Sequence, residues 1–118
     1  MTLRGDIIKL VTKEPARRIF TQIENLTQEE GKVAYYNEIL RSTNINPVTF
    51  NKYISLLLKY NILQSSLSQI EMAEQYESKN VRGSINRTRS VLVKIFRIAP
   101  TDEAEIFRDL LRDYTLEV

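Results

Sequence analysis

Residues 33–63, VAYYNEILRSTNINPVTFNKYISLLLKYNIL, decide the fold of this 118-residue chain. Within them, Asn46 followed by Pro47 predicts a helix start, because Asn caps helix N-termini and proline loses no hydrogen bond at the first helical position. The helix is expected to end near Tyr60, since Asn61 tolerates the left-handed conformation that a C-cap needs. Apolar residues at helical spacing give it one face: Phe50, Ile54, Leu57 and Leu58.

A shorter helix precedes this one along the chain. Tyr36, Ile39 and Leu40 form its apolar stripe, and Thr43 to Asn46 is too short and too polar for anything but a turn. The stretch is therefore predicted to be a helix, a turn and a second helix.

A set of residues in this unit carries a family resemblance: Ile39, Asn44, Ile45, Phe50, Ile54, Leu57 and Asn61-Ile62-Leu63. Their pattern resembles the helix-turn-helix of winged-helix DNA-binding proteins, and it is most similar to the small archaeal regulators and the winged domains of archaeal ATPases. In that family a turn residue, often Gly, stands where Asn44 is, and the second helix reads the major groove. A short step like residues 61–63 then leads into a β-hairpin wing. Leu40 departs from the pattern, because the family usually keeps a small residue there.

Composition bounds the classes of protein that remain. Residues 1–118 are expected to form a single globular domain, with 42% hydrophobic and 27% charged residues and a net charge of +2. Without Cys or His, triad hydrolysis and most zinc sites are excluded. Three glycines cannot build a phosphate loop or a dinucleotide motif. We therefore expect no enzyme, cofactor, metal or small-molecule ligand.

The start of the chain carries charges where a signal peptide would be apolar. No apolar run of the sequence is long enough to span a membrane. We expect a cytoplasmic protein that does not bind membranes and, if it binds DNA, associates with the nucleoid.

The flanks are expected to add helices to a winged helix-turn-helix that is mainly α with a small β-hairpin. Residues 1–12 fit a helix or a strand, and the helix is preferred. A clearer helix begins at Pro15. A C-terminal helix over 101–114 carries an apolar stripe, which either packs on its own core or forms a dimer contact.

Residues 62–100 are expected to hold the wing. Ile62 to Leu67 is the predicted partner of a strand over Val91–Ile98. Between them, Ser68 and Glu71 form a capping box, so an inserted helix over residues 68–77 is preferred to a continuous strand. Residues 80–90 are expected to be an exposed loop or hairpin tip.

The second helix offers the candidate base contacts. Residues 41–60 carry three basic and no acidic side chains. Polar residues opposite the apolar face, or at the helix start, are the predicted contacts: Asn46, Val48, Thr49, Asn51, Lys52, Ser55 and Lys59. Asn51 can pair with adenine and Lys52 can reach guanine, which makes them the best candidates.

The predicted wing supplies four further cations, Lys79, Arg82, Arg87 and Arg89, for the phosphates or the minor groove. Arg17, Arg18 and Arg41 are weaker phosphate candidates.

The leading hypothesis is a sequence-specific double-stranded DNA-binding protein, a homodimeric transcriptional regulator on a two-fold site. The alternative is a winged-helix protein-interaction module in a replication, DNA-segregation or transcription complex. Leu56, Tyr53 and Tyr60 beside the polar face would serve that use.

Overall fold

The computed structural model describes residues 3–29, 32–77 and 84–116, and for 70–77 and 84–91 the course of the backbone. In chain order the elements are α1 (Leu3–Val11), α2 (Glu14–Leu26), β1 (Ala34–Tyr35), α3 (Tyr36–Thr43), α4 (Pro47–Lys59), β2 (Leu63–Glu77), β3 (Ser84–Ile98) and α5 (Asp102–Leu116). Within these residues, five helices accompany one small antiparallel sheet, which confirms the mainly helical class.

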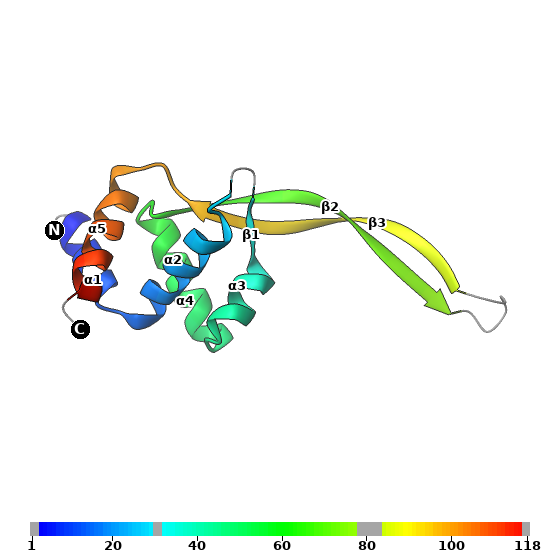
Figure 1. Cartoon of the computed structure of the whole chain (residues 1–118), viewed down its shortest axis with the longest axis horizontal. Helices are drawn as coiled ribbons and strands as arrows, with labels where there is room; N and C mark the ends of the chain where they lie inside the picture. The colour runs from blue at the N-terminus through cyan, green and yellow to red at the C-terminus, as the bar shows by residue number, and fades with distance from the viewer. Residues whose placement is uncertain (1–2, 30–31, 78–83, 117–118) are drawn as a thin grey trace.

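The molecule consists of a helical body and a projecting arm (Figure 1). All five helices gather at one end, and β2 and β3 leave the body together as a twisted ribbon. The extents of 64 × 26 × 25 Å and the radius of gyration of 18.3 Å reflect this arm. A compact domain of this length would have a radius of gyration of about 13 to 14 Å. The hairpin is therefore far longer than the small wing that the sequence predicts.

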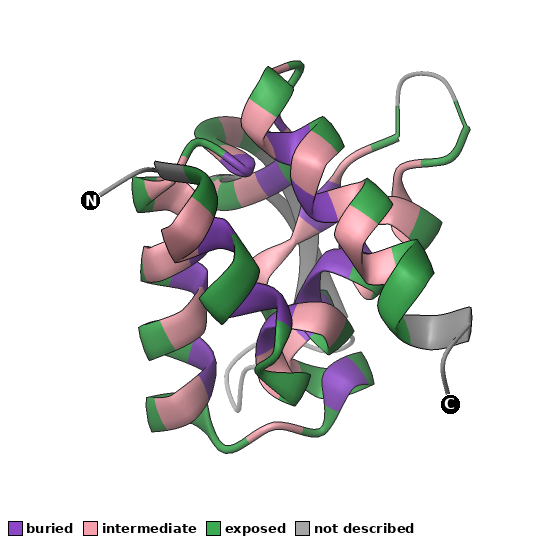
Figure 2. Cartoon of the chain, turned by 90° about the vertical axis from the view of Figure 1, so that its left-hand side faces the viewer, coloured by how far each residue is buried: buried purple, intermediate pink, exposed green. Residues whose placement is uncertain are grey.

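Every helix from α1 to α5 contributes side chains to a single core. Figure 2 shows the buried residues on the inward sides of the helices and the exposed ones outside. Phe20 of α2 and Phe107 of α5 meet in its centre with ring centroids 4.8 Å apart. The other fully buried large side chains are Phe50, Phe96, Ile7, Ile19, Ile23, Ile39, Leu57 and Ile62.

The predicted helices of the body are confirmed. α1 forms over Leu3–Val11, so the N-terminal stretch is a helix and not a strand, because Ile7, Leu10 and Val11 bury one helical stripe. α2 begins one residue before Pro15, and α4 runs from Pro47 to Lys59.

The sheet has the strand order β1-β3-β2, and no sequence pattern predicted β1. Ala34 and Tyr35 pair with Phe96 and Ile95 of β3. Two residues give no periodicity from which a strand could be recognised.

The inserted helix predicted over residues 68–77 is wrong. β2 continues without a break to Glu77, and each of its residues has a partner in β3, from Leu63 opposite Ile98 to Glu77 opposite Ser84. A capping box is a local preference worth about 1 kcal/mol, whereas β2 and β3 are paired over fifteen residues of each strand, with hydrogen bonds at alternate pairs. Long-range pairing therefore overrides the local helix signal.

The loop predicted over residues 80–90 is also wrong in most of its length. β3 begins at Ser84, and 80–83 lie outside the described residues. The sequence did not predict this part of β3 as a strand because its residues are polar. The ribbon projects from the body, so it does not need the apolar alternation of a half-buried strand. The strand predicted over Val91–Ile98 and its pairing with the segment after Ile62 are confirmed.

α5 packs on the body of its own chain. Thr101 caps it by accepting a hydrogen bond from the Ala104 N–H (3.2 Å), and Ala104 and Phe107 are buried. Arg108 Nε lies 2.7 Å from Glu24 Oε2 of α2, and this hydrogen bond raises the pKa of Arg108 above its ordinary value. The apolar stripe of α5 is thus largely used within the monomer.

The fold predicts a sharp contrast within β3. Phe96→Ala should lower the free energy of unfolding by about 3 to 5 kcal/mol, because Phe96 is 1% exposed and its loss leaves a cavity. Leu92→Ala, in the same strand but 67% exposed, should change it by less than about 0.5 kcal/mol. Urea denaturation measures both values. Equal losses would show that the arm packs against the body.

Candidate nucleic-acid interface

Local signals fix both ends of α4. The Asn46 side chain accepts a hydrogen bond from the Val48 N–H at 2.9 Å, and Pro47 occupies the first turn, as predicted. At the other end Asn61 has φ 60°, in the left-handed region, and the Ile62 N–H returns to the Leu57 carbonyl at 3.0 Å. The residues at its two ends therefore fix where α4 begins and where it stops.

The turn between α3 and α4 is equally well defined. Asn44 adopts φ 54°, ψ 37°, which is the left-handed conformation that glycine supplies in other turns. Thr43 before it is buried, and its hydroxyl donates to the Ile39 carbonyl at 2.8 Å. Arg18 of α2 donates to the Thr43 carbonyl at 3.2 Å and so satisfies the C-terminus of α3.

Six of the seven residues predicted for base or phosphate contact on α4 are exposed: Asn46, Val48, Asn51, Lys52, Ser55 and Lys59. Thr49 is half-buried. Val48 is 79% exposed, more than any other large hydrophobic residue described. Val48 thus places an exposed apolar group at the start of a helix that carries no acidic residue.

Asn51 and Lys52 lie on opposite flanks of this face. The Tyr36 hydroxyl of α3 donates a hydrogen bond to Asn51 Oδ1. Lys52 lies beside α1, with its Nζ 5.5 Å from the centroid of the Tyr53 ring. Sequence reasoning placed Tyr36 in an apolar stripe and missed its hydroxyl as the group that orients Asn51. Only the packing of α3 on α4 reveals that contact.

Asn46 also has a structural role. Its side-chain oxygen is engaged as the N-cap of α4, so its first task is to hold the helix start.

Aromatic rings connect α4 to the arm. The Tyr36 ring packs edge-on against Phe50 of α4 at 5.2 Å between centroids, and its centroid lies 6.4 Å from that of Phe96 in β3. Because Phe50 and Phe96 are buried, this cluster sets the position of the outer face of α4 relative to the arm.

The predicted wing cations are divided between the arm and the part of the chain that is not described. Lys79 and Arg82 lie outside the described residues. Arg87 and Arg89 are strand residues of β3, and their Cα partners in β2 are Glu74 and Met72. The register thus sets the acidic segment of β2, Glu71 to Glu77, against the basic segment of β3. Of the three glutamates, only Glu74 is the partner of one of these arginines, because Glu71 and Glu77 pair with Ser90 and Ser84.

The weaker phosphate candidates differ in their surroundings. Arg17 donates to the Val11 carbonyl at 2.9 Å and stacks on Tyr114, with its guanidinium carbon 4.1 Å from the ring centroid. Arg18 pairs with Glu14 and bonds Thr43, so both arginines hold helices together. Arg41 is exposed on α3.

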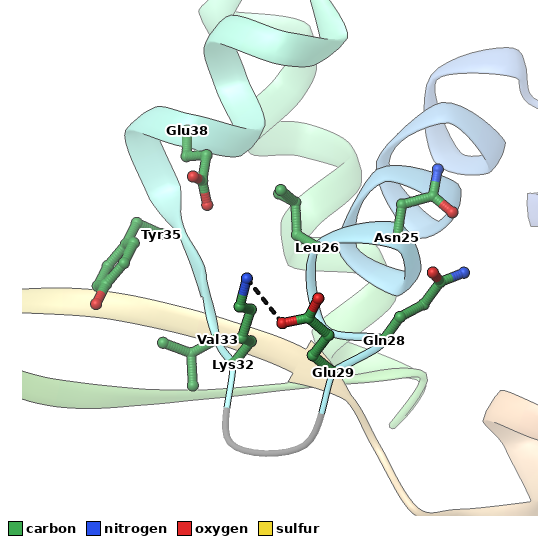
Figure 3. Close-up of a pocket in the computed structure, with 8 residues that line it drawn as sticks. All are labelled: Asn25, Leu26, Gln28, Glu29, Lys32, Val33, Tyr35 and Glu38. Atoms are coloured by element: carbon green, nitrogen blue, oxygen red, sulfur yellow. Dashed lines mark ion pairs between the residues drawn. The ribbon is translucent and has the colours of Figure 1, made fainter.

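A surface hollow of about 480 Å³ lies between the end of α2, β1 and α3, away from α4 (Figure 3). An ion pair at its edge joins Lys32 Nζ and Glu29 Oε2 at 2.9 Å, and Glu38 reaches into it from α3. Lys32 is therefore paired with Glu29, three residues before it in the chain. The hollow brings together none of the predicted contact residues.

Comparison with protein-family models, with curated proteins and with solved structures found no match for the chain. Across the residues that the structure describes, no helix has the length and apolar character needed to cross a membrane.

The cap geometry predicts the effect of changing Asn46. Asn46→Ala should lower the free energy of unfolding by about 0.5 to 2 kcal/mol, because the Val48 N–H loses its acceptor. Asn46→Asp keeps an acceptor at the cap and should restore most of that stability. Thermal unfolding followed by circular dichroism compares the three proteins. An alanine variant as stable as the wild type would contradict the capping role.

Proposed function

We propose that this chain is a sequence-specific double-stranded DNA-binding protein of winged-helix type, with α4 in the major groove. The observation that carries the proposal is the exposed, acid-free outer face of α4 with Val48 at its start. A helix of about 10 to 12 Å diameter fits a major groove about 12 Å wide. Its capped N-terminus also favours phosphate groups through the helix dipole.

The chemistry of the exposed face matches the edges of base pairs. Val48 offers an apolar contact for a thymine methyl group, and Lys52 offers a donor for guanine acceptors. Asn51 can pair with adenine, and the Tyr36 hydroxyl holds its amide in place before DNA arrives. Ser55 and Lys59 lie further along the same face and suit phosphates.

The arm supports the proposal through its length. Ten residues of each strand, from about residue 68 outward, extend about 33 Å, which is close to one turn of B-DNA. An arm of this length beside α4 can follow a groove or the adjoining phosphates. Arg87 and Arg89 supply two cations in β3, with Glu74 opposite Arg87, and the sequence carries Lys79 and Arg82 before them.

A homodimer on a two-fold site remains part of the proposal. Two copies would present two α4 helices about one DNA turn apart and so multiply a modest single contact. The use of α5 within its own core leaves α1, the arm or the remaining surface of α5 as the dimer contact. The archaeal origin and the regulatory role belong to the same proposal and rest on the family resemblance.

One observation favours the alternative, a protein-interaction module. Leu67 and Leu92 are each 67% exposed near the base of the arm. The register pairs Leu67 with Lys94 and Leu92 with Gln69, so the two leucines lie on one face of the ribbon, two positions apart. Exposed leucines of this kind are common at protein interfaces as well as singly on surfaces.

Charge reversal on α4 tests the first proposal. Lys52→Glu should abolish selective binding to a site chosen from random duplexes, because a carboxylate would face guanine acceptors and phosphates. Lys32→Glu is the matched control, since Lys32 is also exposed but lies on the loop after α2. Affinity should be measured by fluorescence anisotropy across a salt series, with a slope near one per phosphate contact. Absence of duplex binding at low salt would leave the interaction module as the better proposal.

The arm makes a different prediction. The double variant Arg87→Ala with Arg89→Ala should weaken binding to the selected site and to random duplex by the same factor, because the arm binds the DNA backbone. The salt slope should fall by about one for each phosphate that the variant no longer neutralises. A weakening confined to the selected site would mean that the arginines read bases.

A further inference from the structure

A second cleft, of about 200 Å³, lies between α1 and α4. Four charged side chains line it: Asp6, Lys9, Lys13 and Lys52. The formal charge of the four is therefore positive. Lys9 and Lys13 are exposed, and Lys52 belongs to the face of α4 proposed to meet DNA.

The floor and walls of this cleft are apolar and aromatic. Leu10 is 5% exposed and Leu56 is half-buried, so the cleft combines apolar side chains with the three lysines that line it. Tyr53 and Tyr60 are half-buried in the wall and bring phenol hydroxyls, which can donate to an anion. An apolar floor with a few converging polar groups is the common form of a small-molecule site.

We propose that this cleft binds a small organic carboxylate with an apolar body. The ammonium groups of Lys9, Lys13 and Lys52 bind the carboxylate, and the body lies on Leu10 and Leu56. The cleft of about 200 Å³ is larger than a cavity of about 150 Å³, which is enough to hold one benzene ring, so it has room for a single-ring ligand. Inorganic phosphate would use the lysines and leave the apolar floor uncovered.

The position of Lys52 gives this site a regulatory consequence, which rests on the proposed function. A carboxylate bound to Lys52 removes that ammonium group from the surface available to DNA. Binding of the ligand then lowers the affinity of the chain for DNA, and binding of DNA lowers its affinity for the ligand by the same factor. The chain would release DNA when the organic acid accumulates.

Ligand binding is tested first without DNA. Sodium benzoate, added to the full ¹⁵N-labelled chain, should shift amide signals around Lys13 and Tyr53 in a saturable way. Acetate carries the charge without the ring, so it should bind at least about threefold more weakly, given the apolar area that it leaves uncovered. Phosphate should also bind more weakly than benzoate. Equal affinities for the three anions, or no saturation, would overturn the proposal.

Two charge-removing variants should move the affinity in opposite directions. Lys13→Gln should weaken benzoate binding about two- to fivefold, as expected for an exposed ion pair. Asp6→Asn should strengthen it by a similar factor, because it removes a like charge from the same cleft. Weaker binding in both variants, or no change in either, with the wild-type pattern of amide signals retained, would contradict the assigned site.

Coupling is tested by duplex binding with and without saturating benzoate, against sodium chloride of equal ionic strength. Benzoate should lower wild-type affinity for duplex about two- to fivefold, as expected for neutralising one exposed lysine. Lys13→Gln should need more benzoate for the same effect.

Benzoate binding without any duplex binding would contradict the DNA-binding proposal and leave the proposed ligand site standing. Duplex binding without benzoate binding would contradict the ligand site alone. Benzoate binding that leaves duplex affinity unchanged would overturn the coupling.

Discussion

The packing of Tyr36 between Phe50 and Phe96 is the contact on which the arrangement of the molecule depends. It joins the start of α3, the buried side of α4 and the central strand β3 in one cluster. Two of its rings are fully buried, and aromatic pairs in this geometry add about 0.5 to 1.5 kcal/mol beyond the area they bury. Because the same ring carries the hydroxyl that bonds Asn51, the core and the outer face of α4 are positioned by one residue.

The body around this cluster is held by short connections between helices. Arg18 closes the end of α3, Arg17 bridges α1 and α5, and Arg108 bridges α5 and α2. From their charge alone, these three arginines would be expected to contact a polyanion. In the structure they hold the helices together instead. The basic residues of α4 itself, Lys52 and Lys59, are exposed lysines, whose ammonium groups are strongly hydrated.

The parts of the fold that sequence could predict are those fixed by neighbours along the chain. The ends of α4 follow from Asn46, Pro47 and Asn61, and its exposed face follows from helical spacing. The long arm could not be predicted, because residues 68–77 carry a helix signal of their own and become a strand only by pairing with residues 84–93. For the same reason the contact between Tyr36 and Asn51, and the cleft between α1 and α4, depend on which helices pack together.

The root of the arm gives it the properties of a lever. Beyond Leu67 and Lys94, whose side chains are exposed, the ribbon extends about 33 Å to Glu77 and Ser84, and its anchorage is concentrated where Phe96 enters the core. A rotation of about 10° at that anchorage would carry the outer end by about 6 Å. A small change in the packing of Phe96 would therefore displace the outer end of the ribbon much more than its base.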